Sequence, residues 1–265
     1  MGASMQYEML KVESTGRIAT VTLNRPEVRN AFNEAMIAEL TDVFTALSTR
    51  DDIRAVVLAA NGVAFCAGAD LNWMKKMARF SDAENRADAK RLANMLAAIY
   101  RCAKPVIARV SGDVYAGGMG LIAASDIVVS VDTARFCLSE ARLGLIPATI
   151  APYVIRALGE RASRRYFTTA EQFDCATALR LGLVHEAVSA NELDATVQKL
   201  AETLGSNGPN AVRESKRLVQ DVAGRMLDEA LIDDTAERIA RVRAGVEGRE
   251  GVASFLEKRA PVWRD

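Results

Sequence analysis

Hydrophobic positions at the start of the chain predict a β-β-α-β order. Residues 7–13 and 18–23 have the alternating or continuous apolar pattern of strands, and the turn at 14–17 contains Gly16. Residues 32–47 repeat apolar side chains at helical spacing. Residues 53–59 form a continuous apolar run, which is typical of a strand buried on both faces. We therefore expect a hairpin, a helix and a buried strand.

The middle of the chain continues to alternate, and its last quarter does not. We expect strands at 105–110, 126–131, 135–138 and 183–188, and helices at 71–77, 92–101, 121–125, 151–158, 161–168 and 175–180. The charged stretch 81–91 is interpreted as a mobile or solvent-facing link, and 169–174 as a second link. Beyond residue 191 the pattern is helical only, at 193–204, 209–223, 226–243 and 247–258. Periodicity thus predicts a mixed α/β region followed by an α-helical one.

Composition narrows the class of protein. The 265 residues are half hydrophobic, which is enough for a sizeable core, and 34 basic residues balance 34 acidic ones. This neutrality argues against a nucleic-acid or membrane-surface partner. The cysteines lie far apart, at Cys66, Cys102, Cys137 and Cys175, and His185 is the single histidine, so buried reduced thiols are expected and a metal site is not.

The start of the sequence and the length of its apolar runs indicate where in the cell the protein is expected. No signal peptide is evident, and no apolar run reaches the roughly 18 residues that span a bilayer. A cytoplasmic location is therefore expected. Residues 1–4, before a second methionine at Met5, look like a remnant of cloning and carry no part of the expectation.

A cluster of glycines and one carboxylate mark the candidate chemistry. Gly117, Gly118 and Gly120 precede an apolar run, where a glycine turn opening a helix either holds an anion or simply packs tightly. Glu140 lies in the apolar stretch FCLSEARLGLIP. Burial there would raise its pKa toward the range useful for proton transfer, whereas an ion pair with Arg142 or with a residue from elsewhere would be structural. Taken alone, the two interpretations of Glu140 are equally good.

Three motifs in order decide between them. FCAGADL, then YAGGMG followed by SDI, then FCLSEARLGLIP resemble the enoyl-CoA hydratase/isomerase (crotonase) superfamily, and TLNRPEVRNAFN and EGVASFLEKRAPVW match its two ends. The resemblance implies an α/β fold, a crotonase-like spiral of β-β-α units with a helical C-terminal region. It further implies a spiral core with the acyl-CoA site over residues 5–200 and a helical trimerisation region over 201–265.

The resemblance also assigns catalytic roles. The backbone N–H groups of Ala69 and Gly117 are implied to hold the thioester oxygen as it becomes an enolate, and a side chain at Gly117 is expected to point into the carbonyl's space. Glu140 matches the second of two glutamates in the best-known hydratases, but Gly120 replaces the first. The residue that would hold water is therefore missing, while the one that exchanges a proton with the α-carbon is present.

Three functions remain open with a single glutamate. Glu140 either takes a proton from water and delivers it to C2, or moves a proton between C2 and C4 as an isomerase, or is structural in a protein that only binds acyl-CoA. RNA binding is a further alternative, against which the neutral charge argues. The finer resemblance, to bacterial methylglutaconyl-CoA and isohexenylglutaconyl-CoA hydratases, favours hydration of a glutaconyl-type acyl group.

A distal carboxylate on such a substrate calls for a cation in the acyl pocket. The candidates are Lys75, Lys76, Arg79 and Arg142, and each is equally compatible with a solvated surface charge.

The remaining expectations concern the pocket and partners. Asp70 is expected to cap the helix beginning at Leu71, Trp73 to line the acyl pocket, and Tyr115 either to hold a water where Gly120 leaves room or to fill space. The expected substrate-binding residues are Ala67, Gly68, Asp70, Leu71, Trp73, Tyr115, Gly118 and Gly120. No cofactor is expected besides the coenzyme A of the acyl-CoA substrate. The family implies a homotrimer or a dimer of trimers.

Overall fold

The protein is described by a computed structural model that covers residues 7–264, so the expectation for residues 1–4 lies outside the described residues. Its largest sheet has six strands in the order β1, β2, β3, β5, β7, β10. These strands are Leu10–Thr15, Ile18–Leu23, Ala55–Ala60, Val106–Val110, Ile127–Val131 and Glu186–Val188. The β1–β2 hairpin is antiparallel and every later pairing is parallel. All six residues of β3 are buried, as its continuous apolar run predicted.

A second sheet of four short strands carries the ends of the candidate site. Its order is β4, β6, β8, β9, with bounds Ala64–Cys66, Asp113–Tyr115, Arg135–Cys137 and Gln172–Asp174. The sequence predicted only β8, because three residues are too few for a periodic pattern to emerge. The segment expected to be a link at 169–174 ends in β9, and β4 lies in what was expected to be a loop. These missed strands matter because the glycine-rich loops begin where β4 and β6 end.

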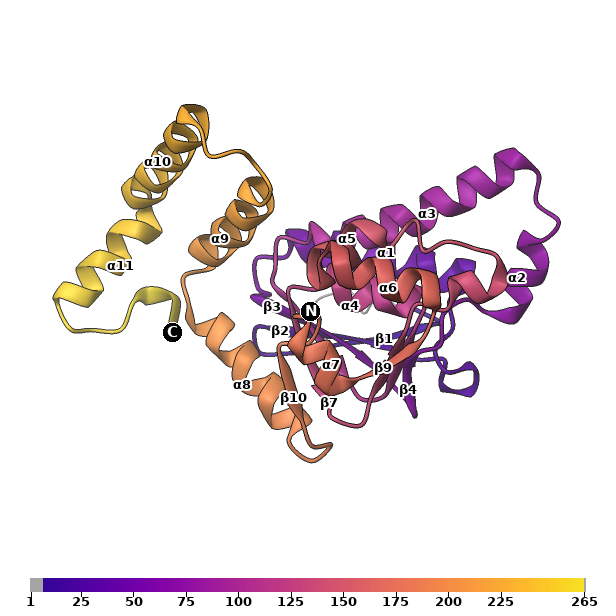
Figure 1. Ribbon diagram of the computed structural model, residues 1–265. Helices are drawn as coiled ribbons and strands as arrows, with labels where there is room; N and C mark the ends of the chain where they lie inside the picture. Colours follow the sequence, from indigo (N-terminus) through magenta and orange to yellow (C-terminus); the bar gives the residue numbers. More distant parts are fainter. Residues whose placement is uncertain (1–6, 265) are drawn as a thin grey trace.

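Helices cover the sheets as parallel strand order requires. In Figure 1, α1, α3, α4, α5 and α6 form a layer over one side of the strands, and α8 lies on another side, where it packs on β3, β5 and β7. The helices are α1 Glu34–Thr49, α2 Leu71–Met77, α3 Asp82–Tyr100, α4 Gly117–Ala124, α5 Ala151–Leu158, α6 Glu160–Thr169, α7 Cys175–Arg180 and α8 Leu193–Ser206, with 3-10 turns η1 Pro26–Val28, η2 Glu140–Leu143 and η3 Val262–Arg264.

The expected link at 81–91 is wrong, since these residues form the first half of α3. Ser81 accepts a hydrogen bond from the Glu84 N–H, and the Glu84 carboxylate accepts one from the Ser81 N–H. This capping box stabilises the start of the helix. The stretch is solvent-facing, as expected, apart from Asp88, which is buried. The other charged side chains of this stretch form the exposed face of a helix.

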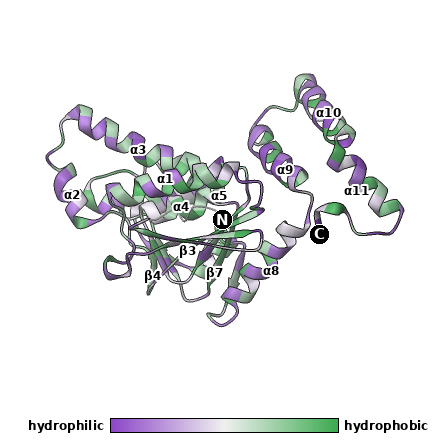
Figure 2. Ribbon diagram, turned by 180° about the vertical axis from the view of Figure 1, so that it is seen from behind, coloured by the Kyte–Doolittle hydropathy of each residue, from purple (hydrophilic) through white to green (hydrophobic). Residues whose placement is uncertain are grey.

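Three helices complete the chain to one side of the sheets (Figure 1). They are α9 Pro209–Val222, α10 Glu229–Ala244 and α11 Val246–Leu256. Figure 2 shows hydrophobic and hydrophilic residues alternating along them, whereas the core strands β3 and β7 are largely hydrophobic. Val246, Phe255 and Leu256 are 89%, 82% and 73% exposed. This C-terminal region therefore presents apolar side chains that its own chain does not cover.

A half-buried ion pair ties α9 to the core. The Nζ atom of Lys216 lies 2.7 Å from the Oδ2 atom of Asp126 and donates a second hydrogen bond to the Lys104 carbonyl. The boundary expected near residue 200 remains a prediction. Across residues 7–264, no helix is long and apolar enough to cross a membrane.

Candidate active site

Two loops meet at the proposed oxyanion site. The first runs from Ala67 to Asp70 after β4, and the second begins α4 at Gly117. Gly68 has φ of +94°, and a Cβ atom added to it would lie 3.0 Å from the Cβ atom of Ala116. A glycine at position 68 therefore permits both the backbone conformation and the close approach of the two loops.

Phe32 organises both loops. Its N–H donates to the Gly68 carbonyl at 2.7 Å, and its carbonyl accepts from the Asp70 N–H at 2.8 Å, so Ala69 is clamped between two hydrogen bonds. The Phe32 ring is 1% exposed and lies against Gly117. Phe32 belongs to the TLNRPEVRNAFN motif, which was noticed only as a family resemblance and not as part of the site.

The backbone amides expected to form the oxyanion hole have no protein acceptor. Among the described residues, neither the Ala69 N–H nor the Gly117 N–H donates a hydrogen bond to another group of the protein. A buried backbone N–H group without an acceptor lowers the stability of the fold. Such groups therefore mark places where a ligand oxygen could accept a hydrogen bond. Both amides are therefore available to a ligand oxygen, and their role in an oxyanion hole stays a prediction.

Ala116 holds a strained backbone conformation immediately before Gly117. Its φ and ψ are 46° and −118°, a region that residues with a Cβ atom rarely occupy. Its N–H donates to the Cys137 carbonyl and its carbonyl accepts from the Met119 N–H, which fixes this geometry. Sequence reasoning missed Ala116, because nothing in the sequence signals a positive φ at an alanine.

The reason given for the smallness of Gly117 is wrong. A Cβ atom at position 117 would lie 2.6 Å from the Phe32 Cε2 atom, so a side chain would strike this ring rather than enter the carbonyl's space. A valine there would disturb the packing that holds both loops, and loss of activity in that variant would not locate the oxyanion hole.

Position 120 leaves no room for water. Gly120 is buried in α4, and an added Cβ atom would lie 2.3 Å from the Ile150 Cγ2 atom and 3.2 Å from the Leu96 Cδ2 atom. Gly118 is packed in the same way, 2.8 Å from the Cβ atom of Cys66. These two glycines serve close packing, and the idea that Tyr115 holds a water in a space left by Gly120 is wrong.

Tyr115 is occupied elsewhere. Its hydroxyl accepts a 2.8 Å hydrogen bond from the Gln172 amide and donates a longer one, 3.3 Å, to Asp113. Burial, followed by the neighbouring Asp113 charge, raises its pKa. The phenol therefore links β6 to β9 as a neutral group.

Glu140 is half-buried, and one oxygen of its carboxylate is buried without a partner. It opens η2, and its Oε2 atom is buried with no hydrogen bond among the described residues. Burial raises the pKa of Glu140, and the backbone N–H of the same residue opposes this shift. Arg142 donates instead to the Ala170 carbonyl at the end of α6. The alternative ion pair with Arg142 is thus wrong, and the acid/base interpretation keeps its structural basis.

The other expected residues surround the first loop. Asp70 caps α2 as predicted, accepting from the Asn72 and Trp73 amides, and it also pairs with Arg25 at 3.0 Å. Trp73 is 4% exposed and lies within the core, and its indole N–H donates a long hydrogen bond, 3.4 Å, to Asp88. Leu71 is 74% exposed beside Ala69.

Two of the four candidate cations are engaged. Lys76 pairs with Glu34 at 2.9 Å, and Arg142 is held by the Ala170 carbonyl. Lys75 and Arg79 are exposed and make no ion pair within residues 7–264.

The cysteines behave as buried thiols. All four are free and buried, as predicted, and burial raises the pKa of Cys66 to about 12. The described residues contain no group of three or more His, Cys, Asp or Glu side chains arranged to hold a metal ion.

Comparison with known proteins agrees with this geometry. The sequence profile of a family described as enoyl-CoA hydratase/isomerase matches residues 13–265. The chain belongs to this family. Its α/β crotonase fold of β-β-α units with C-terminal helices confirms the fold that the motifs implied.

Individual relatives are similar over almost their whole length. A putative enoyl-CoA hydratase of Thermus thermophilus is 33% identical, with 96% of this chain and 99% of the relative covered. The solved structure of an enoyl-CoA hydratase from Shewanella pealeana is 42% identical, with a TM-score of 0.95 and 97% of each chain covered. The mevalonyl-coenzyme A hydratase sidH of Aspergillus fumigatus is 34% identical, with 94% of this chain and 92% of the relative covered. The chain is accordingly an enzyme of the hydro-lyase type.

Proposed function

We propose that this hydratase adds water across the 2,3 double bond of a glutaconyl-type acyl-CoA, methylglutaconyl-CoA or isohexenylglutaconyl-CoA, with Glu140 as its single acid/base. The observation that carries the proposal is the buried, unpartnered Oε2 atom of Glu140 together with the packed glycine at position 120. A carboxyl with a raised pKa exchanges protons near neutral pH more readily than an ordinary glutamate. No second carboxylate has room beside Gly120.

The chemistry follows from these groups. The substrate's thioester oxygen accepts hydrogen bonds from the Ala69 and Gly117 amides, which stabilise negative charge on it. Glu140 removes a proton from water as the water oxygen bonds to C3, and the π electrons move to the thioester oxygen. The resulting enolate takes the proton from Glu140 at C2. One carboxyl thus accepts and donates the same proton, and addition occurs on one face of the double bond.

Recognition of a distal carboxylate is assigned to the cations that the protein itself leaves unpaired. Lys75 and Arg79 lie on and just after α2, which follows the oxyanion loop, and both are exposed without an ion pair among the described residues. Lys76 and Arg142 are less suited, because Glu34 and the Ala170 carbonyl already bind them. The mevalonyl-coenzyme A hydratase among the relatives supports an acyl group other than a plain straight chain.

The proposal includes an assembly and a location. The assembly is a homotrimer or a dimer of trimers, and the exposed apolar residues of α10 and α11 support it. The proposed location is the cytoplasm, and the only proposed cofactor group is the coenzyme A of the substrate.

One assay tests the activity and the acyl class together. Purified protein is given methylglutaconyl-CoA, isohexenylglutaconyl-CoA, crotonyl-CoA and a 3-enoyl-CoA, and the conjugated-thioester absorbance is followed. We expect rapid loss of absorbance with a glutaconyl substrate and slower loss with crotonyl-CoA. Gain of absorbance with the 3-enoyl-CoA alone would identify an isomerase, and binding without turnover of any substrate would refute an enzymatic role.

Two variants test the cations. Lys75→Gln and Arg79→Gln are compared with Lys76→Gln, whose native side chain is already paired. We expect at least one of the first two to raise KM for the glutaconyl substrate roughly tenfold while leaving KM for crotonyl-CoA unchanged. Equal effects on both substrates would show that the distal carboxylate is recognised by other groups.

A further inference from the structure

A second pocket lies away from the oxyanion loops, where α5 and α6 meet the end of α7. Its volume is about 810 Å³, within the size range of small-molecule sites. Four arginines contribute to its lining, which consists of Leu158, Gly159, Glu160, Arg161, Ala162, Arg164, Arg165, Tyr166, Arg180 and Leu181. These lining residues do not include Ala69, Gly117 or Glu140. We call this the arginine pocket.

Positive charge gathers there in a protein with no net charge. Four guanidinium groups face one lining carboxylate, Glu160, so the lining carries three more positive than negative charges. Arg164 pairs with Glu160 at 3.8 Å, and Arg165 pairs with Glu171, outside the lining, at 2.6 Å. In both pairs a carboxylate already neutralises an arginine that a ligand would otherwise contact.

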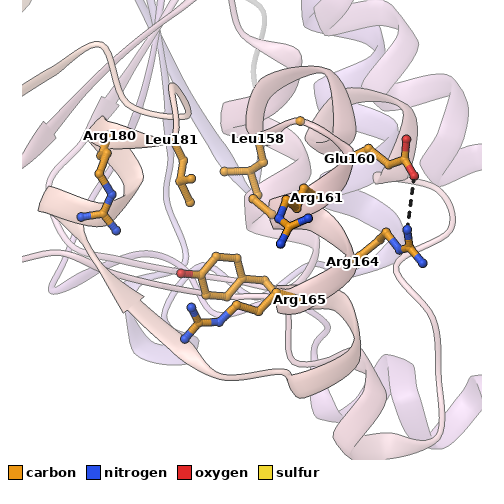
Figure 3. A pocket seen from close by; sticks show the side chains of 10 residues that line it. Leu158, Glu160, Arg161, Arg164, Arg165, Arg180 and Leu181 are labelled. Carbon is orange, nitrogen blue, oxygen red and sulfur yellow. Dashed lines mark ion pairs between the residues drawn. The ribbon is translucent and has the colours of Figure 1, made fainter.

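Arg161 and Arg180 remain available. Both are exposed, and neither makes an ion pair with any residue in the described part of the chain. Arg180 makes only a long hydrogen bond, 3.4 Å, to the Thr177 hydroxyl. In Figure 3, Arg180 approaches from one side of the pocket and Arg161 from the other, while the Glu160–Arg164 pair lies at the edge farther from Arg180. Two unpaired guanidinium groups thus flank one cavity.

The rest of the lining suits a ligand that is partly apolar. Leu158 and Leu181 lie between the two arginines in Figure 3. Tyr166 also belongs to the lining, and its ring contacts the guanidinium of Arg165 and packs against Phe173. Gly159, with φ of +78°, turns the chain directly from α5 into α6. The space beside Gly159 is open, since a Cβ atom added there would meet no atom within 4 Å.

The start of α6 adds backbone donors. Glu160, Arg161 and Ala162 form its first turn and line the pocket, and Gly159 before them has no side chain with which to cap their N–H groups. Amides at the beginning of a helix favour negative charge. Their positive partial charge adds to that of the two guanidinium groups.

We propose that the arginine pocket is a second binding site, for a phosphorylated ligand that carries an apolar or planar group, of the nucleotide class. Guanidinium groups bind phosphate oxygens through paired hydrogen bonds, and the partly exposed Leu181 offers apolar contact to the flat part of the ligand. Two sources share this chemistry: a free nucleotide, or the nucleotide portion of a coenzyme A molecule distinct from the one at the oxyanion loops.

Calorimetric titration of the intact protein tests this site, with ATP and coenzyme A as probes and adenosine and inorganic phosphate as partial ligands. Arg161→Gln/Arg180→Gln removes the unpaired charges at an exposed surface. We expect saturable binding to wild type, weakened at least about tenfold in this double variant, and weak binding of either partial ligand. ATP binding alone would identify a free nucleotide, and a second coenzyme A per chain, lost in the variant, would identify coenzyme A.

A matched variant controls for the loss of charge. Arg243→Gln/Arg249→Gln removes two exposed arginines from α10 and α11, far along the chain from the pocket. It should bind ATP and coenzyme A as wild type does, and all three proteins should hydrate the acyl-CoA substrate with the same KM. No saturable binding by wild type, equal binding by adenosine, or equal losses in both double variants would overturn the proposal. None of these outcomes bears on the hydratase reaction, which is measured separately.

Discussion

At the scale of single residues, the proposed acid/base role of Glu140 gives the most direct test. Glu140→Gln keeps the shape of the side chain but removes the exchangeable proton, so kcat should fall at least about 100-fold with little change in acyl-CoA affinity. Hydration and exchange of the C2 proton with deuterated solvent should disappear together. Continued exchange in a folded variant would point to another acid.

The pH profile of the wild type carries the same information. Since burial raises the pKa of Glu140, and hydration begins with the unprotonated carboxylate, activity should fall with decreasing pH through a value above the ordinary 4.5. An acidic limb at or below 4.5 would contradict this assignment.

Gly120 offers a test of the missing glutamate. Gly120→Glu alone should lower stability, because its side chain would meet Ile150, and we expect little activity from it. Gly120→Glu combined with Ile150→Ala opens space for the carboxyl and should hydrate crotonyl-CoA faster than Ile150→Ala does. Melting temperatures establish folding, and equal rates of the double and the single variant would show that water is already positioned.

The role of a single residue could be predicted where it depends on its neighbours in the sequence, and could not where it depends on the fold. The Asp70 cap could be predicted, because it depends on the next three residues only. The contact of Gly117 with Phe32 could not, since it joins positions 85 residues apart in a fold not yet known. The positive φ of Ala116 likewise results from bonds to other elements, such as the one to Cys137.

At the scale of elements, the cap of α2 allows a direct test of how much one residue contributes to stability. Burial alone would raise the pKa of Asp70, but the Arg25 hydrogen bond and the Trp73 and Asn72 amides outweigh it, and the pKa is lowered. Its contribution to stability is therefore present above the unfolded-state pKa and is lost as pH falls through the folded-state value. Asp70→Ala should cost about 3 kcal/mol, because it leaves the largely buried Arg25 without a carboxylate, although its bond to the Ala31 carbonyl remains.

Asp228 provides the matched control for that prediction. It caps α10 through the Leu231 amide but is exposed and makes no ion pair among the described residues. Asp228→Ala should cost only about 1 kcal/mol. Urea denaturation of both variants gives the comparison, and equal losses would mean that the Arg25 pair contributes nothing beyond the cap.

Elements were predictable in proportion to their length. Helices such as α5 and α7 were predicted with their actual bounds, and β3 within two residues. The strands β4, β6 and β9 escaped because each has three residues, whose pairing depends on other strands. The helical start of α3 could have been predicted from Ser81 and Glu84, since S-x-x-E is a capping-box sequence.

At the scale of the whole molecule, the C-terminal helices predict association. Phe255 and Leu256 are largely exposed at the end of α11. Phe255→Glu would place a charge in the proposed contact, so sedimentation should shift from the trimer or hexamer proposed for the wild type toward monomer. Ser254, beside it, is 3% exposed and offers no equivalent site, so exposed Arg249→Glu in the same helix serves as the control. A monomeric wild type would refute the proposed assembly.

The unpartnered oxygen of Glu140 also makes thermal stability and the proposed catalysis oppose each other. A carboxyl whose pKa is raised by folding makes the native state more stable below its unfolded-state pKa, and this contribution is lost as pH rises through the folded-state value. At neutral pH, Glu140→Gln should therefore melt at a higher temperature than wild type, and this difference should shrink in acid. A screen that rewards heat resistance alone would favour loss of this glutamate and would collect inactive proteins, so directed evolution of this enzyme has to score turnover alongside thermal tolerance.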